Sequence, residues 1–403
     1  MSVLGVEVAV VGLGLIGSAA TRHLANAGRR VVGIGPAEPK DWGTYTDPFA
    51  SYFDSGRITR RLDARREWAI LASRAIDQYG AIEAQSGISF HTPSGLTFVR
   101  RDPRGIANQT EVIRQLQLPV TISRTELQSP AHYCFPAGWT TLTEPAPAGA
   151  IDPRRMVCAQ LTVAEMAGAE ILRESAQKLT KTNSGWQIRT TTARVEAELV
   201  LLATGPYLDT LHSFRVEACV RPEAVILGQI SDREADRLSD LQSVIYLLDH
   251  RSMDDIYVCP PVRYPDGRFR IKMGGSRVDA RTLETSEAKR AWMAGNDADT
   301  QLPVMTEILT TILPDVAFES FEIKPCLITD TSSGLPFVDR IDENLFIAAG
   351  GNGHAAKSAD AIGALGATLV LNDGEWTDLE LDRDQFGFRR GQWSPTDGSR
   401  HGT

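Results

Sequence analysis

Three glycines near the amino terminus have the spacing of a dinucleotide-binding loop. Gly12, Gly14 and Gly17 follow a short apolar run and precede a helical pattern over residues 18–27. In such a loop the first glycine permits a tight turn, the second lets the backbone approach a pyrophosphate, and the third lets the helix pack on the strand. The helix N-terminus then presents unpaired N–H groups to the phosphates. A glycine-rich structural turn is the alternative, but the position between strand and helix favours dinucleotide binding.

The contact to the adenosine ribose departs from the usual pattern. The strand expected at residues 31–34 should end in an acidic side chain that binds the ribose hydroxyls, but Gly35 stands there. Either Glu38 reaches back to the ribose, or backbone groups alone hold it. The departure concerns the ribose only, so the predicted pyrophosphate site is unaffected.

Composition and charge argue against several classes of partner and site. The 403 residues exceed one ordinary core, so we expect two domains or one interleaved pair. The formal net charge of −9 and the lack of a Lys/Arg block argue against nucleic acid and membrane partners. The five cysteines are widely spaced, odd in number and without a CxxC pair. This pattern favours a reducing, cytoplasmic location and argues against disulfides and a metal site.

Apolar periodicity predicts the elements that position the glycine loop. Parallel-strand and helix patterns fill three stretches, residues 7–34, 168–204 and 345–371. Antiparallel patterns lie between these stretches, and a hairpin is expected at residues 88–98. This order predicts an α/β (α+β) fold, in which a Rossmann-type dinucleotide-binding domain is interleaved with an antiparallel-sheet substrate domain.

The predicted domain boundaries follow from these stretches. The dinucleotide-binding domain is expected to be discontinuous, with segments at residues 1–90, 150–215 and 320–386. The substrate domain is expected to comprise residues 91–149 and 216–319. The polar tail, residues 387–403, is expected to be disordered.

Four stretches of the chain resemble FAD-dependent amine oxidases of the D-amino-acid oxidase and glycine oxidase superfamily. They are the glycine loop, the Ser-rich residues 50–60 that end in Arg57-Ile-Thr-Arg60, the strand around Lys272, and the pair formed by residues 324–331 and 347–358. The resemblance is to the branch of monomeric sarcosine oxidase and N-methyltryptophan oxidase, and it runs from Val6 to about Gly374. It implies that the dinucleotide is FAD and that the protein is a monomer.

The resemblance assigns Cys326 as the residue that bonds covalently to the flavin 8α-methyl carbon. Cys326 lies in a polar, turn-rich context rather than in an apolar run. The alternative is an inert buried thiol, which is the usual state of a free cysteine. A thioether withdraws electron density and makes the flavin a stronger oxidant, which suits amine oxidation.

The resemblance also assigns Lys272 as the residue that activates oxygen. A fixed cation stabilises the superoxide that forms when reduced flavin gives O₂ its first electron. The alternative is a surface lysine on a strand. The apolar neighbours Ile271 and Met273 point to the opposite face, so alternation does not decide between the two.

Arg60 and Lys357 match the family pair that binds the substrate carboxylate, and Tyr257 matches an active-site tyrosine. An arginine fork suits a carboxylate, and a lysine adds a point charge. Arg60 could instead belong to a solvated basic face, because other arginines lie close by. Lys357 follows a glycine-rich turn at an expected helix start, where the helix dipole disfavours a cation unless it is used.

The remaining expected cofactor contacts come from the same motifs. Backbone N–H groups after the last core strand would approach the flavin pyrimidine, where reduced flavin carries negative charge. The full set implied by the resemblance is Gly12, Gly14, Leu15, Ile16, Gly17, Ser51, Arg57, Thr204, Gly205, Cys326, Gly350, Gly351, Asn352, Gly353, His354 and Lys357.

One departure bears on the substrate. The family branch has a histidine four residues after the oxygen-activating lysine, and Ser276 stands there. We therefore expect an FAD-dependent oxidase of a secondary or N-substituted amino acid other than sarcosine, with O₂ reduced to hydrogen peroxide. The alternatives are a flavin-dependent dehydrogenase, a D-amino-acid or glycine-type oxidase of a primary amine, an NAD(P)-dependent reductase, and a flavin-binding sensor without turnover.

Overall fold

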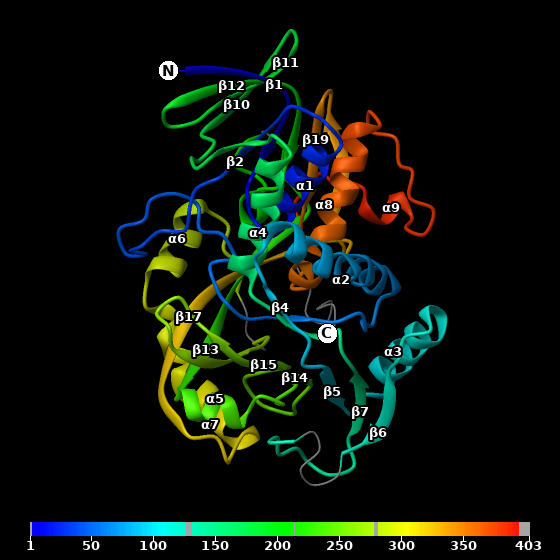
Figure 1. Cartoon of the computed structure of the whole chain (residues 1–403), viewed down its shortest axis with the longest axis vertical. Coiled ribbons are helices and arrows are strands. Elements are labelled where there is room, and N and C mark those ends of the chain that lie inside the picture. Colours follow the sequence, from blue (N-terminus) through cyan, green and yellow to red (C-terminus); the bar gives the residue numbers. More distant parts are fainter. Residues whose placement is uncertain (1, 126–130, 213, 278–280, 395–403) are drawn as a thin grey trace.

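The computed structural model describes residues 2–125, 131–212, 214–277 and 281–394. A mixed eight-stranded sheet occupies the upper half of Figure 1. Its main path runs β10 (Lys178–Thr182), β11 (Gly185–Arg189), β12 (Ala193–Leu202), β1 (Ser2–Val11), β2 (Val31–Ile34) and β9 (Glu170–Leu172). β19 (Leu345–Ala349) pairs with β12, and β18 (Phe337–Asp342) pairs with β19.

The centre of this sheet is parallel and buried. β1 pairs in parallel with both β12 and β2, and β12 pairs in parallel with β19. The strands β2 and β19 are buried at every position, as expected for strands covered on both faces. Four helices, α1 (Leu15–Asn26), α2 (Arg66–Ser86), α4 (Pro153–Met166) and α8 (Ala355–Leu371), pack on one another beside it.

The second sheet occupies the lower half of Figure 1 and is largely antiparallel. Its strand order is β17 (Phe318–Thr331), β13 (Ala218–Ile230), β16 (Phe269–Gly274), β15 (Ile256–Arg263), β14 (Ser243–Tyr246), β5 (Leu96–Arg100), β7 (Thr140–Glu144) and β6 (Thr121–Arg124). A three-stranded sheet is formed by β3 (Arg57–Thr59), β8 (Gly149–Ile151) and β4 (His91–Thr92). The predicted fold class, a Rossmann-type sheet interleaved with an antiparallel sheet, is confirmed.

Several local predictions differ from the structure. The expected hairpin at residues 88–98 does not form, because β4 pairs with β8 and β5 pairs with β7 and β14. Helix α3 (Pro103–Leu116) was not predicted, since few of its side chains are buried. β17 continues in the second sheet to Thr331, past the predicted start of the last dinucleotide-domain segment at residue 320.

The remaining helices are α5 (Asp232–Arg237), α6 (Ser286–Ala294), α7 (Leu302–Ile312) and α9 (Arg383–Phe386). Within the part of the chain that the structure describes, no helix combines the length and apolar character needed to cross a membrane.

The described part of the expected disordered tail, residues 387–394, packs on the protein. Arg390 forms an isolated β-bridge with Val216, and the Glu217 amide donates to the carbonyl of Arg389 over 3.0 Å. These eight residues therefore differ from the expectation, because their backbone groups find partners near the start of β13. Residues 395–403 lie outside the described part.

Candidate functional site

A cavity of about 940 Å³ lies where loops of the first sheet meet strands of the second. The first sheet contributes the loops after β1, β12 and β19, and the second contributes residues of β13, β15 and β17. Because parallel strands end at the same edge of a sheet, the three loops gather beside one another. Every predicted cofactor residue except Gly17 lines this cavity.

The glycine loop has the geometry that its sequence predicts. Gly12 adopts φ +103°, and a Cβ there would lie 2.3 Å from the carbonyl oxygen of Ala203. A Cβ on Gly17 would lie 1.7 Å from the carbonyl oxygen of Gly12, so Gly17 acts by packing. Gly14 is different, because beyond its two chain neighbours the nearest atom to a Cβ there is 4.0 Å away, on Tyr52. The space beside Gly14 is thus left open for a ligand.

Two helices begin at the cavity wall with unused N–H groups. Neither α1, after Gly14, nor α8, after His354, has a side-chain cap or an acidic residue in its first turn. Asn352 fixes the loop before α8: its side-chain oxygen accepts from the Thr331 amide over 2.8 Å, and its side-chain nitrogen donates to the Gly350 carbonyl over 2.8 Å. Both helix ends therefore present positive dipole ends to the cavity.

The missing acidic residue at position 35 has a steric explanation. A Cβ on Gly35 would lie 2.7 Å from the amide nitrogen of Leu13, so no side chain fits at this strand end. Glu38 is bound by Arg154 through two contacts of 2.6 Å. Glu38 does not appear among the described residues of the cavity wall. Of the two ways to hold the ribose, the arrangement favours backbone contact.

The predicted carboxylate-binding residues meet at a buried aspartate that the sequence analysis missed. Asp63 accepts from Lys357 Nζ and from His354 Nδ1, each over 2.9 Å, and from Arg60 Nη2 over 3.4 Å. The His354 ring stacks on Trp68 with the centroids 5.0 Å apart. Burial opposes ionisation of Asp63, but Lys357 and His354 outweigh it and hold its pKa well below the usual range.

The cations beside Asp63 keep a donor that Asp63 does not bind. Burial lowers the pKa of Lys357 to about 8, against the opposing effect of Asp63, and burial also lowers the pKa of His354. Arg60 Nε is buried and has no hydrogen-bond partner among the residues that the structure describes. Arg60 and Lys357 both line the cavity, where a carboxylate could bind the unused donors.

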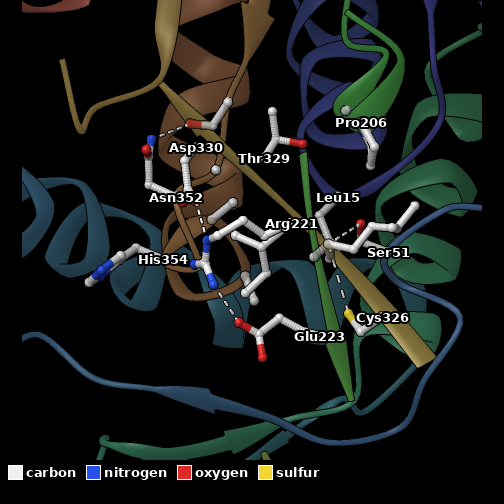
Figure 2. Close-up of a pocket in the computed structure, with 18 of the residues that line it drawn as sticks. Leu15, Ser51, Pro206, Arg221, Glu223, Cys326, Thr329, Asp330, Asn352 and His354 are labelled. Atoms are coloured by element: carbon white, nitrogen blue, oxygen red, sulfur yellow. Dashed lines mark hydrogen bonds and ion pairs between the residues drawn. The ribbon is translucent and has the colours of Figure 1, made fainter. Parts of the chain in front are cut away.

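Cys326 lies on β17 with its half-buried thiol on the cavity wall (Figure 2). Arg57 Nη2 approaches its sulfur to 3.6 Å and donates to the Ser51 carbonyl over 2.9 Å. Trp292 Nε1 donates to the Cys326 carbonyl over 3.0 Å, which fixes the strand at this point. The predicted residues Ser51, Arg57 and Cys326 are therefore adjacent.

The environment of Lys272 is unlike that expected of a residue above the flavin. Its side chain is fully buried, and Nζ donates to Asp54 Oδ2 over 2.5 Å and to the Gly56 carbonyl over 2.6 Å. Asp54 also binds Arg57 and accepts from Tyr264 over 2.9 Å. Among the described residues of the cavity wall, Arg57 is present and Lys272 is not. The predicted role of Lys272 stays a prediction.

Tyr257 and Ser276 both reach the cavity wall. A Cβ on Gly274, the cross-strand partner of Tyr257, would lie 2.5 Å from the tyrosine hydroxyl, so the glycine makes room for the ring. Ser276 donates its backbone amide to Asp255 over 3.1 Å. At the position where the resemblance leads us to expect an imidazole, the chain thus has a serine whose backbone is held by Asp255.

A charged group on β13 also escaped the sequence analysis. Arg221 pairs with Asp330 on β17 and with Glu223 over 2.6 Å, and all three line the cavity (Figure 2). Burial is the main cause that raises the pKa of Glu223 to about 7. The sequence held one indication of this group. Arg221 and Glu223 stand two positions apart in a largely apolar strand, and residues at that spacing share one face.

These observations fit bound FAD. The open glycine loop and the N-terminus of α1 suit a pyrophosphate, and the N-terminus of α8 suits a flavin pyrimidine. The thiol of Cys326 beside the Arg57 guanidinium suits a flavin methyl group. The family model described as FAD dependent oxidoreductase (DAO) matches residues 7–369. The chain belongs to the DAO family of FAD-dependent oxidoreductases.

The DAO-family relatives include curated enzymes and solved structures. Monomeric sarcosine oxidase of Streptomyces avermitilis is 22% identical over 373 residues, 91% of this chain and 93% of that protein. L-saccharopine oxidase of Schizosaccharomyces pombe is 28% identical over 198 residues, 45% of this chain. That match spans only 43% of the saccharopine oxidase.

The solved structure of NikD, an unusual amino acid oxidase essential for nikkomycin biosynthesis, aligns with TM-score 0.75 and 18% identity. The alignment covers 96% of this chain and 98% of NikD. Glycine oxidase from Geobacillus kaustophilus aligns with TM-score 0.69 and 17% identity, covering 96% and 99% of the two chains. These likenesses concern the fold.

Proposed function

We propose that the chain is an FAD-dependent oxidase of a secondary or N-substituted amino acid. The amine is oxidised to an imine, O₂ takes up the two electrons and two protons to give hydrogen peroxide, and water hydrolyses the imine. The observation that carries the proposal is the pair Arg60 and Lys357 on the wall of the cavity that holds the FAD-binding loop. The names of the relatives, sarcosine oxidase and saccharopine oxidase, support an N-substituted amino acid.

The residues of the chain bind and orient the substrate. Arg60 and Lys357 bind the substrate carboxylate, and Asp63 holds both cations in place from behind. The ring of Tyr257 forms another part of the wall. When FAD is bound, it supplies the acceptor for the hydride of the amine carbon.

Covalent attachment of FAD through Cys326 is part of the proposal. Two observations support it: the half-buried thiol lies on the cavity wall, and the Arg57 guanidinium lies 3.6 Å from its sulfur. Acid precipitation of the purified protein tests the bond. Yellow colour that stays with the pellet is expected, whereas flavin released to the supernatant would remove the covalent link and leave the binding site.

A dehydrogenase is the second candidate, and one observation favours it. The ammonium of Lys272 is neutralised by Asp54 behind the cavity wall, so a positive charge for developing superoxide is partly cancelled. A monomeric, cytoplasmic protein remains our expectation, supported for the monomer by the name of the sarcosine oxidase relative.

Turnover in air decides between the two candidates. The purified, FAD-loaded protein is incubated with sarcosine, N-methyl-L-tryptophan, L-saccharopine, L-proline and glycine, and peroxide is measured against oxygen consumed. Equal amounts of peroxide and oxygen with an N-substituted substrate are expected. Reduction of an artificial dye without peroxide would identify a dehydrogenase, and oxidation of glycine alone would identify a primary-amine oxidase.

A further inference from the structure

Glu223 stands on the same face of the second sheet as the proposed flavin attachment site. Glu223 and Cys326 are cross-strand partners on β13 and β17, so their side chains project side by side. Arg221 lies two residues before Glu223 and shares its face. Figure 2 shows these side chains gathered at the cavity, with Asp330 on the far side of the guanidinium.

The charges of this group do not cancel. One guanidinium, that of Arg221, serves two carboxylates, those of Asp330 and Glu223. One Glu223 oxygen accepts from Arg221, and the other points away from it (Figure 2). The side chain is 7% exposed, so a carboxylate in excess is held in a nearly dry wall.

Two cationic side chains, Arg60 and Lys357, line the cavity near α8. Both cations contact the carboxylate of Asp63, and the buried Glu144 also interacts with both. Arg60, Asp255 and Glu223 all line this cavity, so the two regions face the same space. A cavity lined by Arg60 and Lys357 and also by the carboxylate of Glu223 offers partners for both groups of a zwitterionic amino acid, its carboxylate and its ammonium.

We propose that Glu223 binds the amino group of the substrate and accepts its proton before oxidation. The proposal rests on the function proposed above. One N–H bond of the ammonium breaks and one O–H bond forms on the carboxylate, so the amine and Glu223 both become neutral and no electron moves. The neutral amine then has a free electron pair on nitrogen, which favours loss of a hydride from the adjacent carbon. Glu223 returns the proton to water after product release.

Several groups set the protonation of Glu223. Arg221 on the same strand favours the ionised form, whereas burial, Asp255 before β15, and Asp330 on β17 favour the protonated form. The thiol of Cys326 faces it across the strands. Because burial is the largest of these effects and raises the pKa to about 7, ammonium binding should strengthen as the pH rises through this value.

A matched pair of probes tests the charge that Glu223 supplies without requiring the substrate. Glycine betaine carries a carboxylate and a fixed positive charge, and 3,3-dimethylbutanoate has the same shape without that charge. The carboxylates of both probes would bind Arg60 and Lys357 in the same way. The ratio of the two dissociation constants therefore reports only the interaction of Glu223 with the positive charge. Binding of each probe to the FAD-loaded wild type is measured by the change in flavin absorbance. We expect the preference for betaine over 3,3-dimethylbutanoate to grow about tenfold between about pH 6 and pH 8.

Variants and turnover complete the test. In E223Q the ratio should be independent of pH, and the matched variant E322Q, at an exposed position of β17, should behave as wild type. With any amine that the wild type oxidises, kcat/KM should rise with pH near neutrality. We expect this rise to be lost in E223Q. A wild-type ratio that does not change with pH would overturn the proposal, even if E223Q failed to fold.

The two proposals fail in different ways. Peroxide formation with a ratio that E223Q leaves unchanged would refute the role of Glu223 and keep the oxidase. A ratio that depends on Glu223 in a protein that forms no peroxide would refute the oxidase and keep the ammonium site.

Discussion

At the scale of single residues, Lys357 has the most direct effect on the proposed chemistry. Lys357→Met removes one of the two cations that would bind the substrate carboxylate. Since a hydrogen bond to a charged group contributes about 1.5–3 kcal/mol, KM should rise roughly ten- to a hundredfold while kcat changes less. Steady-state kinetics measure this, with K178M at an exposed position of β10 as the control.

The pKa of Lys357 gives the sign of the pH dependence. Burial lowers it to about 8, so the ammonium is charged below this value and neutral above it. Substrate affinity in the wild type should therefore fall as the pH rises through about 8, and this fall should be absent from K357M. Identical profiles for the two proteins would contradict a role in carboxylate binding.

Asp54 supplies the negative charge that pairs with the buried Lys272 and with Arg57, and the variant Asp54→Asn tests this role. Its pKa is held well below the usual value because Lys272 and Arg57 outweigh the effect of burial. A lowered pKa means that the ionised carboxylate stabilises the fold above the ordinary aspartate pKa, and that this stability is lost as the pH falls. D54N leaves Lys272 and Arg57 without their counter-charge, so we expect about 3–5 kcal/mol lower free energy of unfolding at neutral pH.

Urea unfolding of the two proteins measures the D54N effect. The control is D249N, because the Asp249 side chain is 75% exposed and pairs with Arg101 at the surface. A surface pair contributes about 0–1 kcal/mol, so the control should unfold nearly as wild type. A similar small loss in D54N would show that Lys272 and Arg57 find other partners.

The sequence allowed some of these residues to be placed and not others. Arg60, Lys357 and Cys326 were identified by motif, and the structure brings all three to one cavity. Asp54 and Asp63 were missed, because their partners Lys272 and Lys357 are 218 and 294 positions away in the chain. A charged residue in a polar stretch of sequence is expected to be exposed. Only the tertiary structure shows that distant segments bury it.

At the scale of elements, the contact between α1 and α8 is a sensitive point. A Cβ on Gly363 of α8 would lie 2.7 Å from the amide nitrogen of Ala20 and 2.8 Å from the Ile16 carbonyl oxygen in α1. Gly363→Ala should push apart the two helices whose first turns line the cavity. We expect a loss of about 1–3 kcal/mol of stability from overpacking and a lower FAD content per protein.

A second helical glycine supplies the control for Gly363. A Cβ on Gly80 of α2 meets no atom within 4 Å. Gly80→Ala should raise stability by about 0.5–1 kcal/mol, because alanine favours a helix, and should leave FAD content unchanged. Thermal unfolding and the ratio of flavin to protein absorbance measure both effects. Equal behaviour of the two variants would show that the helix contact adapts.

The elements themselves were predictable where the pattern was local. The βαβ unit was found because its strand, glycines and helix are adjacent in the sequence. Helix α3 was missed because only Gly105, Gln109 and Val112 are buried, which gives no apolar stripe. The pairing of β5 with β14 joins segments far apart in the chain, and no local pattern encodes it.

At the scale of the whole molecule, the last described residues close part of the cavity wall. Trp393 and Ser394 line the cavity, and the Gly391 amide donates to the Arg215 carbonyl over 3.1 Å. A chain ending at Phe388 should keep the fold and FAD but lose this wall, so KM for the substrate should rise severalfold. A chain ending at Ser394 should match wild type, and kinetics of both truncated proteins measure the contribution of the segment.

The order of strands in the first sheet has a consequence for biosynthesis. β1 leaves the ribosome first, yet its neighbour β12 is made much later, with Ser2 opposite Ala193. β19 and the start of α8 follow later still, and they complete the cavity wall. The complete FAD-binding cavity therefore forms only once most of the chain has been made. Until β12 is made, the edge of β1 that later pairs with it keeps its backbone groups unpaired.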